Sequence, residues 1–183
     1  MALPLCAAPL IPSLGRHSLA RKTRDFTDAE LAAYSDKHLL YEIRMLIGCA
    51  DLIACKFASG EQSTAWAFSN ARVEAFAIHV RNIVDFLYPR KDKPQDTDVS
   101  AWDFLADRTS LGKIPDSLND ARRRADKEVG HLTTSRRDDD DRGKPWPLEL
   151  VVEVFGVLLK FVQVASPEKL GIQVREVVLN TGK

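Results

Sequence analysis

The fold is decided by residues 61–88, which read EQSTAWAFSNARVEAFAIHVRNIVDFLY. Apolar and aromatic side chains recur there every three or four residues, which is the period of one face of an α-helix. Pro89 follows directly and cannot continue a helix. The pattern therefore predicts one long helix from about Glu61 to Tyr88, long enough to support a bundle. The predicted face contains Ala65, Phe68, Arg72, Phe76, His79, Ile83 and Phe86.

Three more helices are predicted around this one. The segment Thr27-Asp28-Ala29-Glu30 has the form of a capping box, so a helix should begin at Thr27 and end at Ser59-Gly60, with a kink near Gly48. Proline is favoured at a first helical position and begins both later helices. These run from Pro115 to about Gly130 and from Pro147 to about Ala165, and a short extra helix is expected over 99–105. The predicted fold class is all-α, an up-and-down bundle of four main helices.

The two ends of the chain are expected to lie outside the bundle. Prolines interrupt residues 1–25, which we interpret as a disordered N-terminal arm, and the helical domain spans 26–166. The C-terminal tail, residues 167–183, contains alternating β-branched residues between Ile172 and Leu179. This alternation favours a short strand or an extended arm that packs on a partner subunit.

Composition limits the classes of function. The 26 basic and 26 acidic residues balance, so nucleic-acid binding would need a local basic patch. The three cysteines have no metal-ligand spacing, and no metal or other cofactor is expected. The sequence has no recognisable secretory signal and no segment suited to crossing a bilayer, which favours a cytoplasmic protein without membrane contact.

One segment concentrates the side chains that acid–base chemistry needs. Residues 122–131 read RRRADKEVGH, a basic helix that ends at His131 just after Gly130. A helix C-terminus favours the imidazolium and so raises the pKa of a histidine, toward a range where it both accepts and donates a proton. Arg124 lies two turns earlier on nearly the same face as His131.

The pair of Arg124 and His131, separated by six residues, resembles the Arg-X(4–6)-His pattern of the HEPN superfamily of compact helical bundles. The segments 75–87, AFAIHVRNIVDFL, and 126–133, DKEVGHLT, also look like those of bacterial helical proteins near that group, and the likeness covers residues 26–165. The family usually has Asn, Asp or His directly after the arginine. Here Ala125 takes that place, and Asp126 follows one position later.

The resemblance implies a homodimer that acts on RNA as a metal-independent endoribonuclease. In that activity His131 would be the base that activates the RNA 2′-hydroxyl, Arg124 would stabilise the charged phosphate, and Asp126 would orient these groups. Further substrate-binding candidates are a group on the long helix and a lysine between Arg124 and His131. They are His79, Arg81, Asn82 and Lys127.

Alternatives remain open at this point. His131 could cap its helix while Arg122 to Arg124 lie in water or pair with Asp120 and Asp126, and His79 could be a hydrogen-bonded core residue. The chain would then be a non-catalytic helical module that binds a partner protein through apolar surface on the fourth helix or the tail. A third hypothesis is a small-molecule cavity between the second and third helices, lined by His79 and Asn82.

Overall fold

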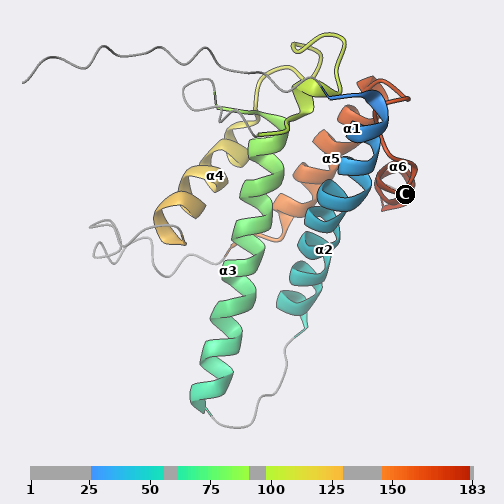
Figure 1. The fold of residues 1–183 in the computed structure, drawn as a ribbon. Coiled ribbons are helices and arrows are strands. Elements are labelled where there is room, and N and C mark those ends of the chain that lie inside the picture. Colours follow the sequence, from blue (N-terminus) through green and yellow to red (C-terminus); the bar gives the residue numbers. More distant parts are fainter. Residues whose placement is uncertain (1–25, 56–61, 91–97, 130–145, 182–183) are drawn as a thin grey trace, which may run out of the picture.

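The structure, a computed structural model, describes residues 26–55, 62–90, 98–129 and 146–181. Consecutive long helices run in alternating directions, so the predicted all-α bundle is confirmed (Figure 1). The predicted arm at residues 1–25 lies outside the described residues. No helix in the described ranges is long and apolar enough to cross a membrane.

The first predicted helix is a continuous run with one irregular turn. It consists of α1 (Asp28–Tyr34), the π-helix η1 (Ser35–Leu39) and α2 (Leu40–Ala54). The capping box is confirmed, because the Glu30 amide donates to Thr27 Oγ1 and the Thr27 amide donates to the Glu30 carboxylate. The helical geometry changes at η1, whereas α2 continues through Gly48, where the sequence predicted a kink. The predicted stop at Ser59-Gly60 lies outside the described residues.

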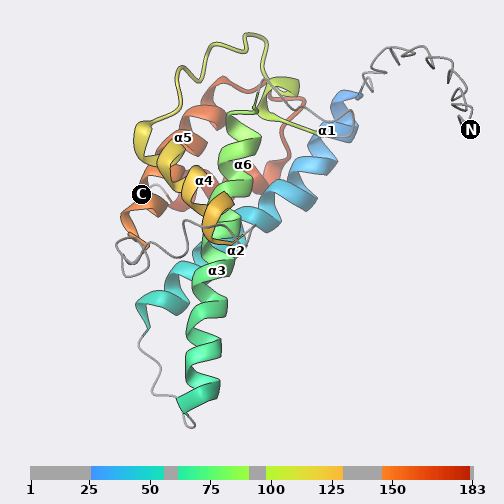
Figure 2. The same cartoon turned by 90° about the vertical axis from the view of Figure 1, so that its left-hand side faces the viewer.

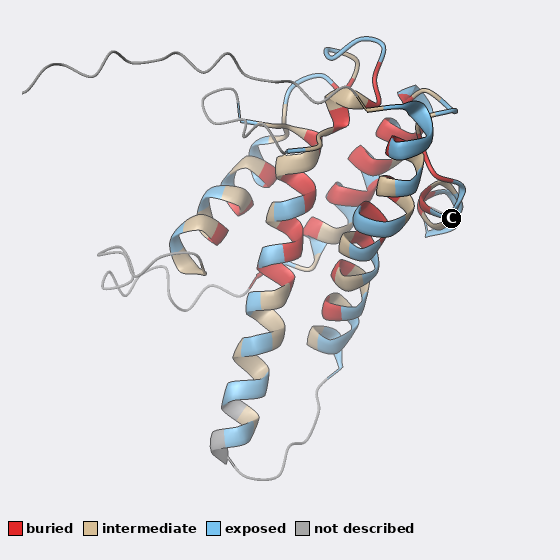
Figure 3. Cartoon of the chain, viewed as in Figure 1, coloured by how far each residue is buried: buried red, intermediate tan, exposed pale blue. Residues whose placement is uncertain are grey.

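The long helix α3 (Gln62–Leu87) forms as predicted and packs against α2, α4 and α5. Its second half is the buried part, including Phe76, Val80 and Ile83. The first turns extend beyond the other helices in both views and contain no buried residue among those described (Figures 1, 2 and 3). Phe68, one of the residues on the predicted face, is therefore 50% exposed. Arg72 instead donates to the carbonyl oxygens of Leu52 and Cys55 at the end of α2.

The core is closed at one end by aromatic rings. The short predicted helix is a single 3-10 turn, η2 (Ala101–Asp103), and the fully buried Phe104 follows it. The Phe104 and Phe161 rings lie edge to face with centroids 5.8 Å apart, and Phe86 makes similar contacts with both. These contacts fasten the η2 segment to α3 and to α5 (Glu149–Val164).

The third main helix of the bundle, α4 (Asp116–Glu128), buries only a thin apolar stripe of Leu118, Ala121 and Ala125 against its neighbours. Its remaining side chains are polar and lie at the surface or along the boundary with α3. That boundary holds most of the charged contacts described below.

The prediction of an extended C-terminal tail is wrong, because residues Ile172–Thr181 form the helix α6. Val174 and Val178 are fully buried and four residues apart, which is helical rather than strand spacing. The helix packs on α5 and on η1. Contacts with the bundle thus override the β-branched alternation that suggested a strand.

Candidate functional site

Charged side chains form a network of ion pairs where α3 and α4 meet. Arg81 Nε lies 2.7 Å from Asp126 Oδ1, and Arg90 Nη2 lies 2.7 Å from Asp126 Oδ2. Asp85 sits beside them, 3.0 Å from Arg90 Nε and 3.5 Å from Arg122 Nη1. We call Arg81, Asp85, Arg90, Arg122 and Asp126 the α3–α4 seam. With three guanidinium groups and two carboxylates, its formal charge is 3 − 2 = +1.

Helical spacing explains the seam. Arg81 and Asp85 are one turn apart on α3, as are Arg122 and Asp126 on α4, so each helix presents one arginine and one aspartate along its edge. Within α3, Arg81 Nε lies 3.6 Å from Asp85 Oδ2. Arg81 lies closer to Asp126 on the other helix. The two side chains form an ion pair, but their geometry does not give a hydrogen bond from Arg81 Nε.

Arg90 keeps its charge in this setting. Partial burial acts to lower the pKa of Arg90, but hydrogen bonds and charge interactions with Asp126 and Asp85 outweigh it and raise the pKa overall. Arg90 therefore keeps a charged guanidinium, a group whose donors match phosphate or carboxylate oxygens.

Arg124 and Asp126 have different surroundings. Arg124 Nε donates to Glu128 Oε1 at 2.6 Å, and its guanidinium lies 4.5 Å from the centroid of the buried Trp146 ring. Two helical positions correspond to a rotation of about 200°, so Asp126 faces the α3 arginines instead. Arg123 pairs with Asp120 one turn away, as the cap-and-pair alternative expected. His131 lies outside the described residues.

His79 and Asn82 converge on one carboxylate of α2. His79 Nδ1 is 2.7 Å from Glu42 Oε2, and Asn82 Nδ2 donates to the same oxygen at 3.2 Å. The His79 side chain is 9% exposed, and the Tyr41 ring meets it edge on. These two residues thus bind α2, so their hydrogen bonds give no support to the hypothesis of a cavity between α3 and α4 lined by them.

Glu42 was not among the candidate residues predicted from the sequence. Its spacing from Tyr34 and His38 on the first helix was the one available signal, because residues four apart share a face. Of the remaining candidates, Lys127 is exposed on α4. Within the described ranges, no group of three or more His, Cys, Asp or Glu side chains is placed to hold a metal ion.

Comparisons of the chain with protein-family models, with curated proteins and with solved structures found no match. The structure thus defines the class of fold, an all-α helical bundle with a network of Arg–Asp contacts between α3 and α4.

Proposed function

We propose that this protein is a HEPN-like, metal-independent endoribonuclease that binds RNA along α3 and α4. The observation that supports the proposal is the 2.7 Å contact between Arg81 and Asp126. It joins the two segments, 75–87 and 126–133, that carry the family resemblance. The two segments that carry the likeness therefore lie side by side, on α3 and α4, which pack against each other.

Each candidate then has a defined role. His131 takes the proton of an RNA 2′-hydroxyl, and the 2′-oxygen attacks the adjacent phosphorus to form a 2′,3′-cyclic phosphate. The bond from phosphorus to the 5′-oxygen breaks, and the leaving oxygen receives a proton from water or from the His131 imidazolium of a second copy. Arg124 stabilises the charge that develops on the phosphate oxygens. A homodimer would place two such pairs in one cleft.

The remaining candidates serve binding. Asp126 is held by Arg81 and Arg90, so it orients the seam, while Arg81 and the exposed Lys127 contact RNA phosphates. His79 and Asn82 support this surface from the α2 side through Glu42. A cytoplasmic location would give the protein access to its RNA substrate.

The test is cleavage of mixed RNA by the purified protein in the presence of a chelator. We expect products with 2′,3′-cyclic phosphate ends from the wild type, and loss of cleavage in His131→Ala and Arg124→Ala. Arg108→Ala is the matched control, because Arg108 is an exposed arginine that lies over Trp102 and takes part in none of the ion pairs that define the seam. Circular dichroism verifies that each variant is folded. Equal cleavage by the wild type and His131→Ala would refute the assignment.

The alternative, a non-catalytic module that binds a partner protein, is favoured by apolar side chains left at the surface. Val152 on α5 is 74% exposed, and Ile172 on α6 is 67% exposed. In that case His131→Ala would leave function unchanged, whereas Val152→Asp would abolish partner binding with the fold intact.

A further inference from the structure

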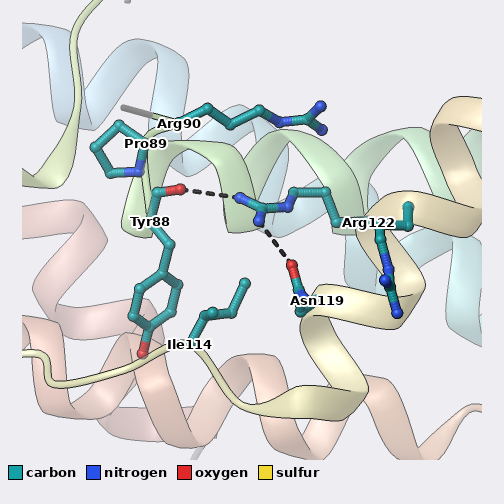
Figure 4. Close-up of a pocket in the computed structure, with 7 residues that line it drawn as sticks. Tyr88, Pro89, Arg90, Ile114, Asn119 and Arg122 are labelled. Carbon is teal, nitrogen blue, oxygen red and sulfur yellow. Dashed lines mark hydrogen bonds between the residues drawn. The ribbon is translucent and has the colours of Figure 1, made fainter. Parts of the chain in front are cut away.

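The arginines in the pocket where the C-terminal end of α3 meets α4 are bound by the protein itself. The pocket measures about 380 Å³, and Figure 4 shows Arg122 donating to the Tyr88 carbonyl oxygen and to Asn119 Oδ1. Arg122 and the neighbouring Arg90 also pair with Asp85. These arginines therefore stabilise the junction of α3 and α4.

A row of aromatic rings lies on another side of α3, where this helix packs against α2. The centroids of the Tyr34 and His38 rings are 4.8 Å apart, and the Tyr41 ring meets the His79 ring edge on at 5.9 Å. Tyr34, His38 and Tyr41 follow one another at spacings of four and three residues, so they share one face of the helical run. We call these four residues the aromatic face.

The outer part of the aromatic face is open to solvent. Tyr41 is 54% exposed and the His38 side chain is exposed as well. Met45 lies one turn beyond Tyr41, is half-buried and extends the apolar surface. Single exposed apolar side chains are normal, but a contiguous row of them is typical of a surface that binds another segment of protein.

Acidic side chains border the aromatic face. Glu42 lies against His79 and accepts a hydrogen bond from Asn82. Burial raises the pKa of the Tyr34 phenol, and the charges of Glu42 and Asp98 raise it further, which places both carboxylates near this ring. A ligand that combines apolar groups with a basic residue would therefore match this surface.

The chain itself contains a segment with this chemistry. Residues 9–12 read Pro-Leu-Ile-Pro, a PxxP motif, and Arg16 follows. A polyproline II helix has three residues per turn, so Pro9 and Pro12 would lie along one of its edges. Proline-rich segments in this conformation bind surfaces lined by aromatic rings, and they lose little conformational entropy on binding.

We propose that residues 8–16 dock on the aromatic face of the same chain as a polyproline II strand, with Pro9 and Pro12 against the His38 and Tyr41 rings. Arg16 then meets the acidic border formed by Glu42 and Asp98. The docked segment covers the surface beside His79 and closes it to other ligands. The proposal does not rest on the ribonuclease function, because it needs neither His131 nor Arg124.

The length of the chain allows this contact. Residues 13–25 separate Pro12 from Phe26, and a segment of that length spans up to about 40 Å when extended. Phe26 directly precedes the helical run, and Tyr41 lies about 22 Å further along it at the rise of 1.5 Å per residue. Tethering also gives the segment an effective concentration of about a millimolar, so a contact of low intrinsic affinity is still formed.

The test uses a nitroxide spin label on Cys6, two residues before the docking segment, and nuclear magnetic resonance of the full chain. Cys55→Ser removes the exposed competing thiol, and Cys49 is buried. We expect the label to broaden the amide signals of residues 34–45 and 78–82 strongly and those of α4 weakly. Equal broadening over α4 would overturn the proposal, because the segment would then have no preferred site.

Two exposed aromatic side chains provide a matched pair of variants. Tyr41→Ala should weaken docking about tenfold, because it removes a ring contact of the proposed site, and the broadening should fall with it. Phe68→Ala removes a ring that is 50% exposed outside the aromatic face and should leave the broadening unchanged. Equal broadening in Tyr41→Ala and the wild type would overturn the proposal.

Proline variants test the other partner of the contact. Replacing both Pro9 and Pro12 with glycine removes the edge of the polyproline II strand, so the broadening of residues 34–45 should be lost. Pro4→Gly is the control, because Pro4 lies outside the docking segment. Equal loss in Pro4→Gly would contradict a contact made by the PxxP motif.

A mixed sample decides whether the segment docks within its own chain. Spin-labelled chains without isotope label are mixed with isotope-labelled chains that contain Cys6→Ser and Cys55→Ser. We expect no broadening in this mixture, since each docking site is covered by the segment of its own chain. Broadening as strong as in the directly labelled chain would overturn docking in the same chain and assign the contact to a second copy.

Discussion

Asp36 and Gly171 are in direct contact although they lie at opposite ends of the described chain. A Cβ atom on residue 171 would overlap the Asp36 carboxyl group, so this close approach requires glycine. Ser35 Oγ accepts the Gly171 amide proton at 2.8 Å, and Asp36 Oδ1 accepts that of Val174 at 3.0 Å. The π-helix η1 thus satisfies free amides at the start of α6, which joins the last helix to the first.

Gly171→Ala should destabilise the protein by about 1–3 kcal/mol. The added methyl group displaces the Asp36 carboxylate and so breaks its bond to Val174 as well as overpacking the contact. Urea unfolding followed by circular dichroism measures the change in unfolding free energy.

The control for this substitution is Gly156→Ala, in the middle of α5. A Cβ there has no neighbour within 4 Å, so alanine should stabilise the helix by about 0.5–1 kcal/mol. The two glycine variants should therefore shift stability in opposite directions. If both stabilised the protein, the close contact between η1 and Gly171 would be wrong.

Glu42→Ala should cost about 1–3 kcal/mol of unfolding free energy. The substitution removes the acceptor shared by His79 and Asn82 and leaves the nearly buried imidazole without its partner. Glu42→Gln keeps an acceptor oxygen and should cost less. A double-mutant cycle with His79→Ala isolates the coupling between the two side chains, and a coupling near zero would contradict the observed contact.

Cys49 should react with iodoacetamide much more slowly than Cys55. Burial hides the Cys49 sulfur and raises the pKa of its thiol, so the reactive thiolate is scarce around neutral pH, whereas Cys55 is exposed. Peptide mapping by mass spectrometry after timed alkylation gives both rates in one sample. In urea the difference should disappear, and comparable rates in the folded protein would contradict the placement of Cys49.

Stability should fall as the pH rises through about 10, in part because of Tyr34. Burial raises the pKa of the Tyr34 phenol, and the charges of Glu42 and Asp98 raise it further. The unfolded chain then loses the phenol proton first, so its deprotonation favours unfolding once the pH passes the ordinary value. Tyr34→Phe should reduce this alkaline loss while keeping the ring contact with His38.

The comparison for Tyr34→Phe is made on the same unfolding assay near pH 8.5 and pH 10.5, values on either side of the ordinary tyrosine pKa of about 10. The unfolding free energy of Tyr34→Phe relative to that of the wild type should be higher near pH 10.5 than near pH 8.5. An unchanged difference would show that the phenol does not couple folding to pH.

Local patterns predicted the helices well where several signals agreed. The capping box at Thr27, Pro89 after the long apolar face, and the strongly apolar segment that became α5 each combine a boundary signal with helical periodicity. Phe68 lies on the predicted face and is nevertheless exposed, because periodicity defines a face but does not say how far along the helix a neighbouring helix continues. The sequence indicated Arg81 and Asp126 of the α3–α4 seam as separate candidate residues. It did not indicate that the two side chains pair with each other.

The sequence by itself determined the all-α class, the central helix and the main boundaries, because capping, proline and period act over a few neighbouring residues. Tertiary structure alone decided that residues 172–181 are helical, since burial of Val174 and Val178 and the Asp36 contact outweigh a weak local strand preference. It also decided that Asp126 pairs with Arg81 and Arg90, and that His79 pairs with Glu42. Such pairings depend on how whole helices dock, and no spacing within one helix encodes them.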